Sequence, residues 1–326
     1  MEQRHIGTEL SCSALGLGCM GFSQAYGPAD DDESITTIRH ALDLGVSLLD
    51  TAMSYGGGHN EALVGRAITG RRDQVILATK FGIVRDEHGV HLDGRPEHVA
   101  GYCDASLDRL GVDVIDLYYL HWVDPEVPVT DTIGAMADLV AAGKVRHLGV
   151  SETNAGQLHA AVGVHPIAAL QTEWSLLWRE PEDDVIPAAR HLGVGLVAYS
   201  PLGRGMLTGA LPPGNFTGGD FRAADPRFAG ADLARNLAVV DAIGALAAER
   251  GVTPGQLALA WLLAQGPDVI PIPGTRSPRR VGENAAAADL ELSAADLARL
   301  EEVTPRSAWA GDRFSFAAQR TARTTA

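Results

Sequence analysis

Short apolar runs alternate with amphipathic stretches along almost the whole of this 326-residue sequence. Eight such runs are typical of β-strands, and each is followed by a stretch with helical spacing of its apolar residues. The expected strands span residues 14–20, 47–51, 75–80, 114–121, 146–151, 169–173, 195–200 and 269–273. Because parallel strands are joined through helices, the alternation predicts an α/β fold, a single-domain (β/α)8 TIM barrel over residues 1–326.

Helices are expected near residues 33–44, 60–69, 96–110, 130–143, 155–164, 183–192, 236–250 and 277–287. Three segments fall outside this repeat. An N-terminal β-hairpin, turning at Gly7-Thr8, is expected to cap the barrel floor. A long loop, 203–232, follows the seventh strand and is typical of a lid or binding loop. A C-terminal helix, 294–303, precedes a tail with three aromatics, Trp309, Phe314 and Phe316, which is expected to pack against another surface rather than extend freely.

The acidic composition limits the partners of the chain. A net charge of −15 argues against nucleic acid or an anionic membrane, because binding to either requires a basic surface. Three cysteines without metal-type spacing indicate a reducing compartment and no disulfide framework. With no membrane-spanning run and no secretory leader, we expect a cytoplasmic protein. Whether the protein forms a homo-oligomer is left open by the sequence.

Lysine is scarce in this sequence, which has two lysines, Lys80 and Lys144, against 24 arginines. A lysine retained in such a background indicates a position where arginine would not serve. Lys80 ends the apolar run Val75-Ile-Leu-Ala-Thr-Lys80, whereas Lys144 lies in a polar turn. Lysine is a compact charge whose pKa responds to burial, so Lys80 is a candidate for chemistry.

Ionisable side chains gather at the ends of three successive strands. Asp50 ends the second strand and Tyr55 follows it, Lys80 ends the third and His121 ends the fourth. The active site of a barrel of this kind lies at these C-terminal strand ends, so we expect the four side chains to converge. Lys80 is expected to lower the pKa of Tyr55 and Asp50 to orient Lys80, giving a general acid suited to carbonyl reduction by hydride.

These residues resemble the catalytic tetrad of the aldo-keto reductases. The match begins with Asp50-Thr-Ala-Met-Ser-Tyr55-Gly, Lys80 in Ala-Thr-Lys-Phe-Gly, and His121 in Asp-Leu-Tyr-Tyr-Leu-His. It continues, in the expected order, through Gly149-Val-Ser151, Leu170-Gln171, Val197-Ala-Tyr199-Ser200-Pro-Leu-Gly, Ile272-Pro-Gly-Thr-Arg276 and Glu283-Asn284. The resemblance implies a reductase of aldehydes or ketones that uses NADPH, with a small-molecule carbonyl substrate.

The resemblance also implies a cofactor site across the barrel mouth. Ser151 and Gln171 would hold the nicotinamide carboxamide, and Tyr199 would stack on its ring. Ser200, Leu202 and Gly203 would line the pyrophosphate. The adenosine end would be held by Thr275, Arg276 and Arg280 at the 2′-phosphate, and by Glu283 and Asn284 at the adenine. Arginine suits such a phosphate because its planar fork binds in a bidentate manner.

Two departures from the family pattern bear on the cofactor. Many members have Asn directly after the serine of the fifth strand, whereas this chain has Glu152 there, with Asn154 two residues on. Either Asn154 substitutes or the carboxamide is held differently. Some members place lysine where this chain has Gly274, which weakens the preference for NADPH over NADH.

Two other motifs are set aside. Gly16-Leu-Gly18-Cys-Met-Gly21 has the spacing of a dinucleotide fingerprint, but the residues after it are typical of a loop, not a helix. We assign Met20 and Gly21 to the cofactor instead, because the glycines permit close approach of this loop to the nicotinamide or the substrate. His88, His91 and His98 lie in a polar stretch, expected to be a surface loop turning at Asp93-Gly94, and predict no metal site.

Aromatic residues near the expected mouth form a candidate substrate wall. Phe22, Tyr26 and Trp122 are assigned to it, while Phe81 and Trp174 fit core packing equally well. A second function also remains open: a redox-sensing or regulatory subunit that binds the cofactor and turns over slowly.

Overall fold

The structure is a computed structural model, and it describes residues 1–7, 10–86, 89–211, 216 and 219–313. Eight parallel strands form one sheet in the order β12-β11-β10-β9-β8-β5-β4-β3. They are β3 (Leu17–Gly18), β4 (Leu48–Asp50), β5 (Ile76–Phe81), β8 (Ile115–Leu120), β9 (Val145–Ser151), β10 (Ile167–Glu173), β11 (Gly195–Tyr199) and β12 (Val269–Pro271). Each of the eight expected strands is therefore present.

Two backbone hydrogen bonds join the outermost strands and close the sheet into a barrel. The Gly16 N–H donates to Pro271 O at 2.9 Å, and the Gly18 N–H donates to Pro273 O at 3.3 Å. The seam is close, because a Cβ on Gly18 would lie 2.8 Å from Ile272 O. The predicted (β/α)8 fold is confirmed.

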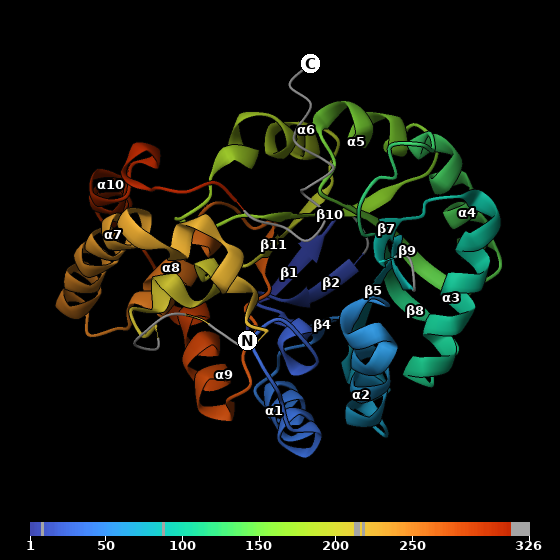
Figure 1. The fold of residues 1–326 in the computed structure, drawn as a ribbon, viewed down its shortest axis with the longest axis horizontal. Coiled ribbons are helices and arrows are strands. Elements are labelled where there is room, and N and C mark those ends of the chain that lie inside the picture. Colours follow the sequence, from blue (N-terminus) through green and yellow to red (C-terminus); the bar gives the residue numbers. More distant parts are fainter. Residues whose placement is uncertain (8–9, 87–88, 212–215, 217–218, 314–326) are drawn as a thin grey trace.

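Helices surround the barrel on all sides (Figure 1). They are α1 (Asp31–Asp43), α2 (His59–Ile68), α3 (Pro96–Leu110), α4 (Val129–Ala141), α5 (Ala155–Val162), α6 (Val185–His191), α7 (Gly230–Glu249), α8 (Pro254–Leu263), α9 (Pro278–Ala285) and α10 (Ala294–Val303). Helix α10 has the predicted bounds. Helix α8 was not predicted, and α7 begins at Gly230 rather than at residue 236.

The strands are apolar along their whole length because each is buried on both faces. In β8, Leu117 and Tyr119 point into the barrel, while Tyr118 and Leu120 pack with the helices outside. Such two-sided burial explains why these strands are continuous apolar runs rather than alternating ones.

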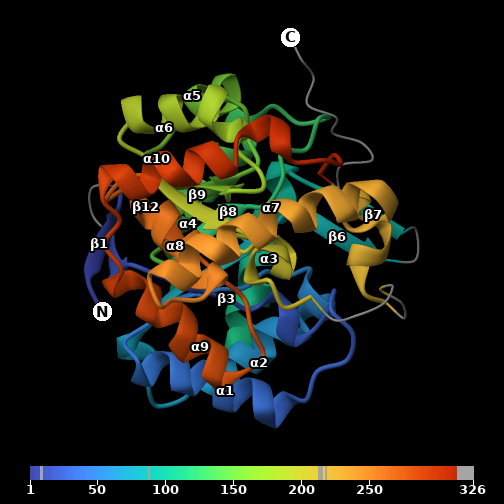
Figure 2. The same cartoon turned by 90° about the vertical axis from the view of Figure 1, so that its left-hand side faces the viewer.

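The barrel floor is closed by the predicted N-terminal hairpin. Strands β1 (Gln3–Ile6) and β2 (Leu10–Ser13) pair antiparallel, and Ile6, Leu10 and Cys12 pack with the residues inside the barrel. Gly7 has a positive φ of 62°, as a turn requires, while Thr8 lies outside the described residues. A second hairpin, β6 (Ile83–Asp86) with β7 (Gly89–Leu92), lies at the opposite end of the molecule (Figure 2).

This second hairpin replaces the polar surface loop that the sequence predicted around His91. The long loop after β11 contains three short 3-10 helices: η5 (Gly203–Thr208), η6 (Phe221–Ala224) and η7 (Pro226–Phe228). In the tail, Trp309 packs against the main core as expected, while Phe314 and Phe316 lie outside the described residues.

All three cysteines are buried and free. No helix in the described part of the chain is long and apolar enough to cross a membrane.

Candidate active site

Three neighbouring strands bring three of the predicted catalytic residues to one end of the barrel. Asp50 is the last residue of β4, Lys80 is near the end of β5, and His121 follows β8 directly. These strands are adjacent in the sheet, with Asp50 paired to Ala78 in register, and Lys80 to Tyr119.

Tyr55 reaches the same point from the loop that follows β4. It begins the 3-10 helix η2 (Tyr55–Gly58), and the loop before it is held to β5 because the Met53 N–H donates to Lys80 O at 3.0 Å. Its ring meets that of His121 edge-to-face, with centroids 5.8 Å apart. The structure therefore brings all four predicted residues together.

Lys80 is the centre of this group and is fully buried. Its Nζ donates to the Asp50 carboxylate, to Thr51 O at 2.8 Å and to the Tyr55 hydroxyl oxygen at 3.4 Å. Three donors thus meet three acceptors, which is the capacity of an ammonium group. The second Asp50 oxygen accepts from Gln171 Nε2 at 2.7 Å, so Gln171, assigned by sequence to the carboxamide, also orients Asp50.

Burial dominates the proton affinities in this group. It lowers the pKa of Lys80, although Asp50 acts in the opposite direction. The pKa of Tyr55 is raised well above its usual value, first by burial and then by Asp50. The expectation that the pKa of Tyr55 is lowered is therefore wrong, because burial and the Asp50 charge both disfavour a phenolate.

His121 is held neutral at physiological pH. Burial, and then the Lys80 charge, lower its pKa well below 6.5. Its Nδ1 is buried and has no hydrogen-bond partner among the described residues. A neutral imidazole carries one N–H donor, which suits it to contact an uncharged oxygen.

The residues expected to hold a pyrophosphate lie in an unusual stretch of backbone after β11. Ser200, Gly203, Arg204 and Gly205 have φ values of 49°, 54°, 58° and 94°. Turns of this kind expose N–H groups on a concave surface that suits an anion. Tyr199 ends β11 directly before this stretch, and Ser151 ends β9 at the same end of the barrel, with β10 between the two strands.

The residues expected at the adenosine end lie at and before α9. Arg280 is exposed there, without an acceptor among the described residues. Arg276 is already engaged, because its guanidinium donates to Tyr26 O at 2.8 Å and to Pro28 O at 2.5 Å. Glu283 accepts from Thr253 Oγ1 at 3.0 Å, so α8 helps to orient it. Thr275 and Asn284 are partly buried beside these residues.

The proposed substrate wall is changed by the structure. Phe22 is 2% exposed and belongs to the main core, so its assignment to the wall is wrong. Tyr26 packs edge-to-face on Phe221, at 5.4 Å, beneath the loop that follows β11. Trp122 follows His121 directly in sequence and is 8% exposed. Met20 and Gly21 form a short 3-10 helix with Phe22 and are both partly buried.

Asn154 does not replace the asparagine missing after Ser151. Its side chain caps α5, accepting from the Gln157 N–H at 2.8 Å. Glu152, with a positive φ of 56°, instead points its carboxylate at β10, where it accepts from the Glu173 N–H at 3.1 Å.

A charged cluster at the mouth was missed by sequence reasoning, and we call it the mouth network. Its six members are three carboxylates and three guanidiniums, of which four are buried and Glu152 and Arg313 are mostly buried, namely Glu152, Glu173, Asp225, Arg204, Arg227 and Arg313. Glu173, at the end of β10, accepts from Arg227 at 2.7 Å, while Asp225 accepts from Arg204 at 2.6 Å and from Arg227 at 2.8 Å. The network ties the loop after β11 and the C-terminal segment to the strand ends.

His91 and His98, near the second hairpin, both lie close to carboxylates, and His91 Nδ1 is 3.9 Å from Asp86. His98 contacts Asp93 at 2.7 Å, and Arg95 and Tyr102 donate to the same carboxylate. In the described part of the chain, no group of three His, Cys, Asp or Glu residues is placed to hold a metal ion. His88 lies outside the described residues.

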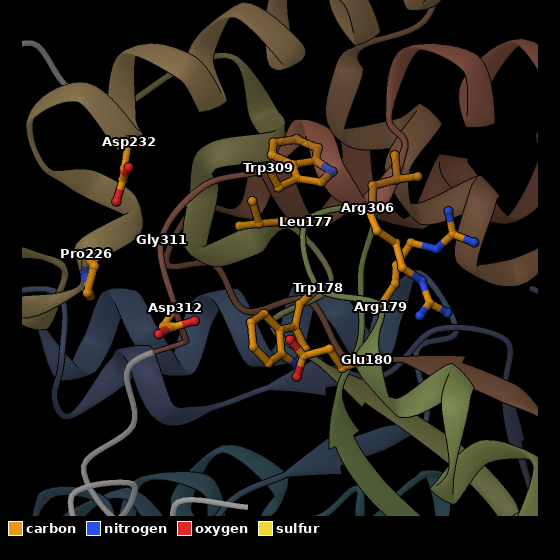
Figure 3. Close-up of a pocket in the computed structure, with 11 residues that line it drawn as sticks. Leu177, Trp178, Arg179, Glu180, Pro226, Asp232, Arg306, Trp309, Gly311 and Asp312 are labelled. Carbon is orange, nitrogen blue, oxygen red and sulfur yellow. The ribbon is translucent and has the colours of Figure 1, made fainter.

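A cavity of about 510 Å³ lies beside the mouth, between the loop after β10, the start of α7 and the C-terminal segment (Figure 3). Its walls are Leu176, Leu177, Trp178, Arg179, Glu180, Pro226, Asp232, Arg306, Trp309, Gly311 and Asp312. Because these walls include none of the four converging residues, we do not assign the chemistry to this cavity.

Comparison with known proteins agrees with this geometry. A profile of the Aldo/keto reductase family matches residues 14–305. The chain is 41% identical over 313 residues to the probable aldo-keto reductase 1 of Glycine max, covering 95% of this chain and 90% of that protein.

Two solved structures extend the comparison. A glycerol dehydrogenase from Gluconobacter oxydans superposes with a TM-score of 0.85 at 32% identity, over 96% of this chain and 97% of that one. An aldo/keto reductase from Klebsiella pneumoniae, solved with NADP and acetate, gives a TM-score of 0.73 at 30% identity, over 94% and 96%. The protein described here belongs to the aldo/keto reductase family.

Proposed function

We propose that this protein reduces aldehydes or ketones to alcohols with NADPH, and that Tyr55 is the proton donor. The observation that carries the proposal is the contact of the Lys80 ammonium with both Asp50 and the Tyr55 hydroxyl at one end of the barrel. Aldo/keto reductase structures with NADP and with NADPH are among those that resemble this chain, which supports the cofactor.

The direction of one hydrogen bond explains how Tyr55 would act. Lys80 donates to the phenol oxygen, so the phenol's own hydrogen is free to point at a substrate oxygen. The raised pKa keeps Tyr55 protonated at neutral pH, as a proton donor must be. Once that proton leaves, the same ammonium stabilises the phenolate.

His121 and Asp50 would support this step from either side. Neutral His121, with its ring against Tyr55, would donate a hydrogen bond to the carbonyl oxygen and help to position it. Asp50 would keep Lys80 charged despite its burial. When bound, NADPH supplies the hydride that adds to the carbonyl carbon.

The residues present fit the cofactor at both ends. The turn from Ser200 to Gly205, in which Ser200 and residues 203–205 have positive φ, suits a pyrophosphate, with Leu202 and Gly203 lining it. Exposed Arg280 is free to meet a 2′-phosphate, and Arg276 would hold the loop of Tyr26 over the same end. At the nicotinamide, Ser151 and Gln171 would bind the carboxamide and Tyr199 would stack on the ring, while Met20 and Gly21 approach from β3.

The test is oxidation of NADPH by the purified protein with an aryl aldehyde, compared with NADH at equal concentration. We expect many turnovers with NADPH. The variant Tyr55→Phe should lose turnover by several orders of magnitude while still binding NADPH, measured by quenching of tryptophan fluorescence. Tight binding of NADPH without turnover by the wild type would favour the redox-sensing role, and unchanged turnover by Tyr55→Phe would refute the assignment of the proton donor.

A further inference from the structure

The last described residue, Arg313, lies at the barrel mouth, against two tryptophan rings and the carboxylates of Glu152 and Glu173. Its guanidinium carbon is 5.9 Å from the centre of the Trp122 ring and 5.7 Å from that of the Trp178 ring. Trp122 follows His121 in the chain. Arg313 also acts electrostatically on Tyr199, the residue proposed to stack on the nicotinamide. The guanidinium therefore lies near Trp122, assigned to the substrate wall, and near Tyr199, proposed to stack on the nicotinamide.

The segment that carries Arg313, residues 309–313, is fixed in place, and we call it the strap. Fully buried Asn236 binds both backbone groups of Ala310: it donates to the carbonyl oxygen at 3.0 Å and accepts from the N–H at 2.8 Å. At Gly311, φ is +83°, and a Cβ would lie 2.7 Å from Arg227 N. Figure 3 shows the strap passing from Trp309 through Gly311 to Asp312 beside Trp178. Arg313 is thus held in position by its backbone.

Arg313 has more donors than the protein satisfies. Nη2 donates to the Glu152 carboxylate, and Nε lies 3.8 Å from a Glu173 oxygen. Nη1 is buried and has no hydrogen-bond partner among the described residues, although the side chain is 10% exposed. A buried donor of a charged group without an acceptor is costly, and such groups are usually met by another protein group, an ordered water or a ligand.

The charge of the site indicates which acceptor fits. Arg313 belongs to the mouth network, in which three carboxylates face three guanidiniums. The network is balanced, so an incoming carboxylate would add a negative charge without a partner in a buried place. A neutral oxygen needs only the hydrogen bond that Nη1 still offers.

We propose that Arg313 Nη1 recognises a second, uncharged oxygen on the substrate. The preferred substrates are then carbonyl compounds with a hydroxyl or second carbonyl group near the reacting carbonyl, rather than hydrocarbon aldehydes. This inference rests on the proposed reductase function. Arg313 would act as a specificity-determining residue, supplied by the C-terminal segment rather than by a strand end.

The test compares kcat/KM for 2-hydroxypropanal, propanal and glyoxylate, which differ in carrying a hydroxyl, no second oxygen group or a carboxylate. The variants are Arg313→Met and, as a matched control, Arg306→Met. Arg306 lies in the same C-terminal segment, is 40% exposed and pairs with Glu182 and Asp183. The ratio of two substrates on one preparation cancels any inactive fraction. Arg313→Lys serves if the methionine variant does not fold, since it keeps a charge for Glu152 but loses the planar fork.

We expect the ratio of 2-hydroxypropanal to propanal to fall about 10- to 100-fold in Arg313→Met and to stay unchanged in Arg306→Met. An unchanged ratio in Arg313→Met would overturn the proposal, and so would a loss confined to glyoxylate, which would show recognition of an anion. If the wild type reduces none of the three but reduces an aryl aldehyde, this inference fails and the reductase function stands. If it reduces no carbonyl at all, the reductase function itself fails.

Discussion

Glu173 offers a quantitative test of the mouth network. The carboxylate is fully buried at the end of β10. Burial alone would raise its pKa, but Arg227, Arg204 and Arg313 together lower it from 4.5 to about 2. A lowering of this size corresponds to roughly 3 kcal/mol of folding free energy at neutral pH. Breaking a buried ion pair by removing one partner costs a similar amount, about 3–5 kcal/mol.

The substitution Glu173→Gln should therefore lower the free energy of unfolding by about 3 kcal/mol at pH 7. Because the pKa is lower in the folded protein, the stabilisation is complete above the unfolded pKa and is lost as pH falls from about 4.5 towards 2. The deficit of the variant should accordingly be constant from pH 7 to pH 6 and should shrink below pH 4.5.

Urea unfolding followed by tryptophan fluorescence measures this difference, since urea is uncharged and leaves ion pairs unscreened. Glu249→Gln is the matched control: Glu249 pairs with Arg299, but both side chains are about half exposed, so no measurable change is expected. A Glu173→Gln protein as stable as the wild type at pH 7, with the same dependence on pH, would refute this account of the network.

Two further pairs of substitutions, each a test and its control, probe other parts of the structure. Lys80→Met should abolish carbonyl reduction, while Lys144→Met should leave the rate unchanged, because Lys144 pairs at the surface with Asp104. Steady-state oxidation of NADPH measures both rates. Activity of Lys80→Met within tenfold of the wild type would contradict the role of the ammonium. Gly65→Ala should destabilise the fold by about 1–3 kcal/mol, because a Cβ there lies 2.4 Å from Leu110 O between α2 and α3. Gly101 has open space around it, so Gly101→Ala should be neutral or should stabilise the fold by up to about 1 kcal/mol. Equal thermal midpoints for the Gly65 and Gly101 variants would show that the packing at Gly65 is not close.

The barrel was predictable because its signal is local and repeated. Each strand is a continuous apolar run, and most helices show a polar face that separates them from the strands. Helix α8 escaped because almost all its residues are buried, so it has no polar face to reveal its period. Its start is nonetheless marked by a capping box: the Thr253 side chain accepts from the Gln256 backbone N–H, and the Gln256 side chain accepts from the Thr253 backbone N–H.

The convergence of Asp50, Lys80 and His121 followed from one rule, that parallel strands end at the same face of a barrel. No such rule connects Glu152 with Arg313, which lie 161 residues apart in sequence. Phe22 was misplaced for a related reason. Its position after β3 is at the mouth, but whether an aromatic ring there faces the core or the opening depends on side chains from α1 and α2.

The seam of the barrel has a consequence for how long the folded protein lasts. Pro271 and Pro273 have no N–H to donate, so the first and last strands meet through bonds given by Gly16 and Gly18 alone on that side. The segments just beyond these two strands carry Met20 and Gly21 on one side and Thr275 to Asn284 on the other. A dinucleotide bound to both segments would hold the first and last strands together. At a free concentration a hundredfold above its Kd, it would raise the free energy of unfolding by roughly 2.7 kcal/mol. The supply of cofactor would then govern the lifetime of the protein against proteases, besides its rate of turnover.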